Sequence, residues 1–183
     1  MKLFTLSGLA FALALFMTAC GGGETEQPAQ QQTAVDDGVR TIVIIGNDDM
    51  KFVVESPAEG LVTGGAVGSL TLLEAIQVAP GEEIRITLKT RSNLPPQVMA
   101  HNFVLVELGT DVDAFQRASL AARDNEFIAP DFEDQVLVAT RMLSGGQEQT
   151  ITFTAPETPG EYDYLCTFPG HFAAGMVGKL IVQ

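Results

Sequence analysis

The chain has 183 residues, of which 46% are hydrophobic, and its formal net charge is −13. This length suits one domain with additional segments rather than two full domains. Acidic residues outnumber basic ones by 23 to 10, so the sequence offers no basic patch and excludes nucleic acid as a partner.

The first residues have the pattern of an export signal. Lys2 precedes an apolar run over residues 3–17, and small residues then lead to Cys20. The run is too short for an ordinary membrane span. The segment resembles a bacterial lipobox, so we expect a lipoprotein signal peptide over residues 1–19 and lipidation of Cys20. An uncleaved anchor and an ordinary signal cleaved elsewhere are the alternatives. All three place the folded part outside the cytoplasm, facing the periplasm or the cell surface.

Residues 20–39 are expected to form a lipidated, flexible tether. The stretch after Cys20 is rich in Gly and Gln and contains no apolar run. Such a linker would leave the following domain, residues 40–183, free to move near the membrane.

The domain is expected to be all-β. β-Branched and alternating stretches are separated by turn signals such as Pro80-Gly81, Gly145-Gly146 and Pro159-Gly160. Residues 58–69, rich in Gly and Ala, are interpreted as a loop or irregular insertion. The predicted strands cover residues 41–45, 50–55, 70–78, 83–90, 103–108, 135–140, 149–153, 162–166 and 177–182.

One segment between the predicted strands favours a helix. Asp111 or Asp113 is placed to cap a short helix that runs through Ala114, Phe115 and Ala118. Many short strands with one such helix in a long inter-strand segment predict a Greek-key β-sandwich.

The C-terminal segment places three metal-binding side chains on one short loop. Cys166, His171 and Met176 supply a thiolate, an imidazole and a thioether between two predicted strands. The chain has only one other histidine, His101, at the start of a predicted strand. Two imidazoles and one thiolate with a weak thioether suit one copper ion that cycles between Cu(I) and Cu(II), with zinc as the main alternative.

The same residues resemble the azurin and plastocyanin group of cupredoxins. The likeness rests on Met99-Ala100-His101-Asn102 before an apolar strand and on the CTFPGH motif ending at His171, followed by Met176. The resemblance implies a cupredoxin fold and a type 1 (blue) copper site with His101, Cys166, His171 and Met176 as ligands.

The resemblance also implies roles for neighbouring groups. The carbonyl of Ala100 would make a weak contact opposite Met176, and Asn102 would tie the two ligand loops together. Backbone N–H donation near Phe168 would stabilise the cysteine thiolate. Two features depart from azurins: four residues separate His171 from Met176, as in plastocyanin, auracyanin and rusticyanin, and the N-terminal disulfide has no counterpart.

Apolar residues flank the expected copper ligand His171. They would either form a docking collar for a redox partner or simply seal the site from water. They lie on the two loops that carry the ligands: Leu94, Pro95, Pro96, Phe168, Pro169, Phe172 and Ala173.

The expected function is one-electron transfer, without a small-molecule substrate, between the chain and redox proteins such as a c-type cytochrome, a membrane oxidoreductase or a terminal oxidase. The alternative is an extracytoplasmic copper chaperone or buffer, which the scattered methionines favour less. A copper enzyme such as a nitrite reductase or an oxidase needs a second, open copper site with further imidazole ligands, and both histidines are already used by the first site. We therefore expect the chain not to be an enzyme.

Overall fold

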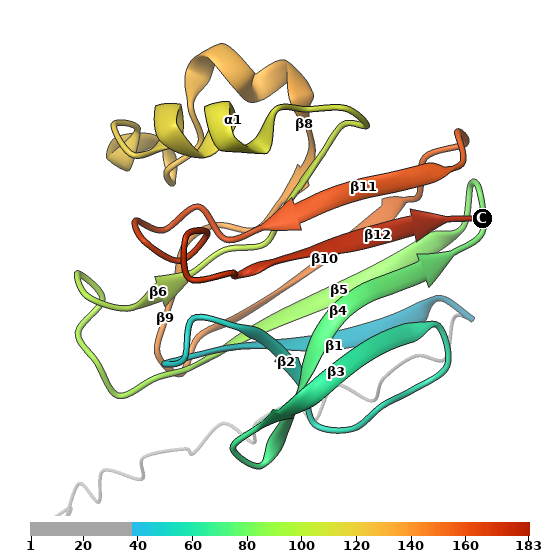
Figure 1. Ribbon diagram of the computed structural model, residues 1–183, viewed down its shortest axis with the longest axis horizontal. Helices are drawn as coiled ribbons and strands as arrows, with labels where there is room; N and C mark the ends of the chain where they lie inside the picture. The colour runs from blue at the N-terminus through green and yellow to red at the C-terminus, as the bar shows by residue number, and fades with distance from the viewer. Residues whose placement is uncertain (1–37) are drawn as a thin grey trace, which may run out of the picture. The chain divides into compact units, whose positions relative to one another are not determined.

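A computed structural model describes residues 38–183 (Figure 1). The predicted signal peptide, Cys20 and nearly all of the tether lie outside the described residues. Within residues 38–183, no helix is long and apolar enough to cross a membrane. The strands are β1 Arg40–Asn47, β2 Phe52–Val54, β3 Leu61–Val67, β4 Leu70–Val78, β5 Glu83–Arg91, β6 Ala100–His101, β7 Val104–Val106, β8 Val136–Ala139, β9 Leu143–Ser144, β10 Glu148–Thr154, β11 Gly160–Leu165 and β12 Val177–Val182.

The strands confirm the predicted all-β sandwich. One hydrogen-bonded path runs β10-β5-β1-β2-β4-β12-β11-β7-β8, with β3 attached to β4, and β6 pairs separately with β9. Most pairs are antiparallel, but β1 pairs with β5 and β12 with β4 in parallel. The β12–β4 pair brings the C-terminal strand of the chain against its first half.

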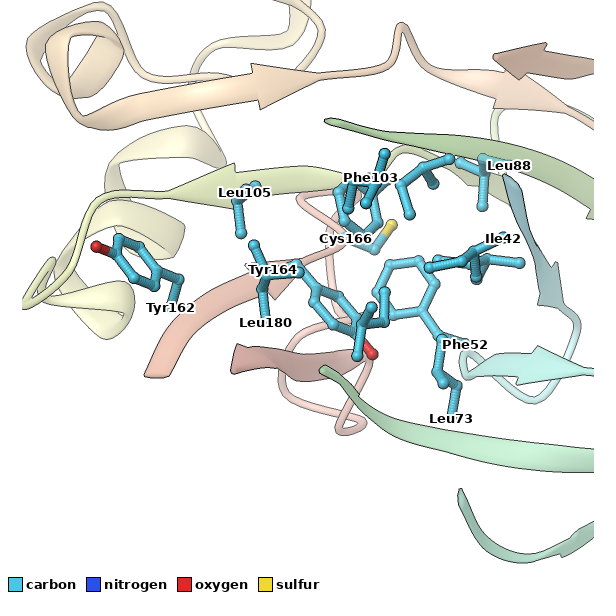
Figure 2. Packing of buried hydrophobic residues seen from close by; sticks show 14 of the residues in the cluster. Ile42, Phe52, Leu73, Leu88, Phe103, Leu105, Tyr162, Tyr164, Cys166 and Leu180 are labelled. Atoms are coloured by element: carbon cyan, nitrogen blue, oxygen red, sulfur yellow. The ribbon is translucent and has the colours of Figure 1, made fainter. Parts of the chain in front are cut away.

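The core lies between the inward faces of these strands and reaches the C-terminal loop. Phe52, Phe103 and Tyr164 pack edge-to-face or stacked, with ring centroids 5.0–6.1 Å apart. Figure 2 shows the sulfur of Cys166 among these apolar side chains. The thiol therefore sits at the end of a packed core, where water is excluded.

The segment between β7 and β8 forms the predicted helix and two 3₁₀ turns. Helix α1 spans Val112–Ser119, and the 3₁₀ turns span Arg123–Asn125 and Pro130–Gln135. Asp111 caps the helix, because its side chain accepts a hydrogen bond of 2.9 Å from Ala114 N. In Figure 1 this segment lies on the side of the sheet formed by β8 and β11.

The loop predicted over residues 58–69 is wrong, because strand β3 occupies Leu61–Val67. β3 pairs with β4 through two register shifts, between Val62 and Thr63 and between Thr63 and Ala66. Such bulges, next to the Gly64-Gly65 pair, interrupt the alternation of side chains by which a strand is recognised.

Candidate metal centre

Two separate parts of the chain bring the metal-binding side chains together. Cys166 follows β11, and its backbone N–H bonds to the carbonyl of Met176 just before β12 (3.1 Å). His101 belongs to β6, which pairs with β9. The loop 166–176 and β6 lie at the same end of the strands in Figure 1.

His101, Cys166 and His171 form a compact, buried group. One ligand-type atom from each lies within 4.8 Å of the other two. The sulfur of Cys166 is 3.4 Å from Nδ1 of His171 and 3.9 Å from Nδ1 of His101, and the imidazole centroids are 4.8 Å apart. Both rings therefore direct the same nitrogen toward the sulfur, as convergent metal ligands do.

The loop between His171 and Met176 is closed by its own backbone. Ala174 N donates to Gly170 O (3.0 Å), Gly175 N to Phe172 O (2.8 Å) and Met176 N to His171 O (2.9 Å). Met176 is fully buried and belongs to the same core cluster as Cys166. These three overlapping hydrogen bonds accommodate the four residues between His171 and Met176 and leave the side chain of Met176 buried.

Burial keeps both imidazoles neutral. Desolvation, followed by the charge of His171, lowers the pKa of His101 to about 3, while desolvation lowers the pKa of His171 to about 4. Neutral imidazoles have a free lone pair for a metal at neutral pH. Desolvation raises the pKa of the Cys166 thiol to about 12, against the effect of backbone hydrogen bonds from Asn102 and Phe168. A cation in the site would reverse this balance and hold the thiolate.

Asn102 joins the two ligand-bearing segments through its side chain. Its Nδ2 donates to Thr167 Oγ1 (2.7 Å), and Thr167 N donates back to Asn102 Oδ1 (2.8 Å). Both residues are fully buried. The pair therefore fixes the start of the cysteine loop relative to the residue that follows His101.

Two features near the site were not found from the sequence. Gly46 of β1 lies against the ring of His101, and a Cβ on it would be 2.6 Å from His101 Cγ. The predicted strand ended at residue 45, whereas β1 runs to Asn47, so the sequence pattern did not mark Gly46 as a glycine inside a strand. The helical segment also contacts both ligand-bearing segments: Gln116 Nε2 donates to Thr167 O (3.2 Å), and Asn102 Nδ2 donates to Glu126 O (3.2 Å). No local pattern marks these long-range contacts.

The expected collar residues differ in exposure. Those on the two loop tips are exposed, namely Leu94, Pro95, Pro96, Pro169 and Ala173, and Leu94 is 42% exposed. Phe172 is half-buried and packs against the cluster under helix α1, whereas Phe168 is buried against His171 with ring centroids 4.7 Å apart. Pro96, Phe168 and Pro169 line the same surface hollow. Ala100, whose carbonyl was expected near the metal, is buried in β6.

The donor set fits copper better than zinc. Zinc also binds thiolate and imidazole ligands, so His101, Cys166 and His171 alone do not distinguish the two metals. The additional donor on the loop is the soft thioether of the buried Met176, which favours copper. One thiolate and two neutral imidazoles, held in a buried cage, are the trigonal donor set of a type 1 copper site.

Comparisons with known proteins agree with this chemistry. Residues 61–183 match the family described as copper binding proteins, plastocyanin/azurin family. The chain belongs to this family of blue copper proteins, the cupredoxins, and its site is a single type 1 copper site built on His101, Cys166 and His171 with Met176. The expected fold, family and cofactor are therefore confirmed.

The most similar relatives include auracyanins. Auracyanin-B of Chloroflexus aurantiacus is 37% identical over 134 residues, which are 71% of this chain and 54% of that protein. Outer membrane protein H.8 of Neisseria meningitidis serogroup B is 36% identical over 107 residues, 57% of each chain. The crystal structure of dithionite-reduced auracyanin from Roseiflexus castenholzii superposes with a TM-score of 0.59 and 31% identity, covering 78% of this chain and 96% of that one. The alignments span little more than half the length of these two curated relatives.

Proposed function

We propose that this chain is an extracytoplasmic carrier of single electrons. The buried His101, Cys166 and His171 group carries the proposal, because it can hold copper in both oxidation states without an open coordination position for substrate. Copper in the site would supply the one-electron redox step. The protein holds the ligands in a packed environment, which limits rearrangement when the charge changes.

The backbone around Cys166 supports a redox role rather than metal storage. Two N–H groups donate to the sulfur, and the ligand loop is closed by its own hydrogen bonds. Such donors stabilise the thiolate and tune the potential of a bound metal. In a chaperone that transfers its metal, we would expect the ligand loop to open more easily.

Cu(II) titration of the compact unit Asp36–Gln183 tests the proposed function. We expect one equivalent to bind with intense visible absorption and a reversible voltammetric wave, and Cys166→Ser to abolish the colour. A colourless site without a reversible wave would reject electron transfer. Rapid loss of copper to a mild chelator in both oxidation states would favour the chaperone alternative.

We propose that electrons pass at the His171 end of the molecule to a redox protein such as a c-type cytochrome, a membrane oxidoreductase or a terminal oxidase. Support comes from the exposed apolar side chains on the loop tips around this ligand. Leu94→Asp should slow electron exchange with a cytochrome partner. Leu137→Asp is the matched control, since Leu137 is 41% exposed on β8, outside the ligand loops. Equal rates for both variants would place the docking surface elsewhere.

We further propose that a lipid on Cys20 holds the domain at a bacterial membrane, after removal of a signal peptide over residues 1–19. The apolar run before Cys20 supports this proposal, as does the similarity to a relative named as an outer membrane protein. Replacing Cys20 by Ala should release the chain from membranes. Firm attachment of that variant would favour an uncleaved anchor.

A further inference from the structure

Helix α1 presents one buried amide to the cysteine loop. Gln116 is only 7% exposed, and its Nε2 donates to the carbonyl of Thr167 at 3.2 Å. The other end of this side chain is poorly satisfied, since Oε1 has no hydrogen-bond partner among the described residues. A buried, unpaired amide oxygen destabilises a fold, so packing alone does not explain a glutamine here.

The carbonyl that Gln116 binds belongs to a peptide group that also faces the metal centre. The Thr167–Phe168 peptide presents its C=O to Gln116 and its N–H to the sulfur of Cys166. Hydrogen bonds in such a chain polarise one another, so donation to the carbonyl strengthens the N–H as a donor. The contact also holds the peptide plane in one orientation, because Thr167 is fully buried.

We propose that Gln116 is a positioning residue that tunes the copper site through the Thr167–Phe168 peptide. The hydrogen bond of this side chain goes to the Thr167 carbonyl and not to a metal ligand. It sets the orientation and strength of the N–H donor that faces the Cys166 sulfur, and thereby the electron density that the thiolate offers to copper. The effect of Gln116 on the copper site rests on the proposed electron-transfer function. Its effect on the orientation of the Thr167–Phe168 peptide can be tested in the copper-free chain.

The fold offers a matched control on the same helix. Ser119 is fully buried and its Oγ accepts a hydrogen bond from Ala129 N at 3.2 Å, within the helical segment. Ser119→Ala therefore loosens the packing of helix α1 without removing a contact to the cysteine loop. Gln116→Met keeps the length of the side chain, removes the donor and removes the unpaired oxygen, so this variant should fold.

The first measurement is amide hydrogen exchange of Phe168 by NMR in the purified, copper-free chain. We expect Gln116→Met to raise the exchange rate about fivefold, the change that loss of one ordinary hydrogen bond produces. Ser119→Ala should leave it unchanged. An unchanged rate in Gln116→Met, or equal changes in both variants, would overturn the proposal.

The second measurement is voltammetry of the copper-loaded chain. A weaker donor to the sulfur favours Cu(II), so Gln116→Met should lower the equilibrium constant for reduction about two- to fourfold. Ser119→Ala should match the wild type, and an identical potential in all three proteins would overturn the tuning role. Absence of a reversible wave in the wild type would instead reject the proposed function, and the exchange measurement would still decide the positioning.

Discussion

Replacing Gly46 by Ala should disturb the metal centre although Gly46 binds no metal. A Cβ at this position would lie 2.6 Å from Cγ and 2.7 Å from Cδ2 of His101. Neither the β1 backbone at Gly46 nor the ring of His101 can move away easily. Gly46 lies in β1, where it is paired with Phe52 on one side and Thr90 on the other, and His101 is fully buried.

The size of the effect follows from this geometry. Carbon atoms make ordinary contact at about 3.5 Å or more, so the 2.6 Å approach requires a displacement of roughly 0.9 Å. Overpacking of this kind costs about 1–3 kcal/mol of unfolding free energy. Metal–ligand distances tolerate only about 0.2 Å. The ring shift should therefore weaken copper binding more clearly than it weakens the fold.

The assay combines denaturant unfolding of the copper-free domain with Cu(II) titration followed by visible absorption. Gly65→Ala is the matched control, since a Cβ on Gly65 meets no atom within 4 Å. We expect the control to match the wild type and Gly46→Ala to lose both stability and copper affinity. Wild-type stability and an unaltered copper spectrum in Gly46→Ala would refute the proposed role of this close contact.

Three further outcomes are expected. Asn102→Leu removes the buried reciprocal pair across the ligand segments and should lower the unfolding free energy by about 2–4 kcal/mol, measured with denaturant. Lys51→Met removes a cation that donates to the carbonyl of Ala174, so the reduction potential should fall while the visible absorption is retained; an unchanged potential would contradict this. In the copper-free protein, folding lowers the pKa of His101 to about 3 and of His171 to about 4 from 6.5. The unfolded chain therefore binds more protons below about pH 6.5, and stability should fall between pH 6.5 and 4; equal denaturation midpoints across this range would contradict it.

Most strands could be predicted from the sequence, because the signals that mark a strand lie in neighbouring residues. Residues 70–78 and 177–182 were predicted with the bounds that β4 and β12 have in the structure. Turn residues flank β4, with Gly68-Ser69 before it and Pro80-Gly81 after it, and buried and partly exposed side chains alternate along β12. β3 was missed for the opposite reason, since two register shifts break that alternation.

The metal ligands could also be predicted from the sequence, because of the chemistry of their side chains and the small number of histidines. Cys166, His171 and Met176 lie on one loop, and the chain has only one other histidine to complete the set. The structure brings His101 of β6 next to Cys166 and His171 of the C-terminal loop, with the two imidazole centroids 4.8 Å apart. Counting donors was enough, because few residue types bind copper.

The sequence by itself determined the all-β class, the copper chemistry and the residues that carry it. Only the tertiary structure decided what supports them: Gly46 under His101, Asn102 bound to Thr167, and Gln116 bound to the peptide before Phe168. The physical reason is that metal-ligand identity depends on side-chain chemistry, which each residue carries with it. Close packing and hydrogen bonding depend on distances between residues that are 51 to 65 positions apart in the sequence, and those distances exist only in the folded chain.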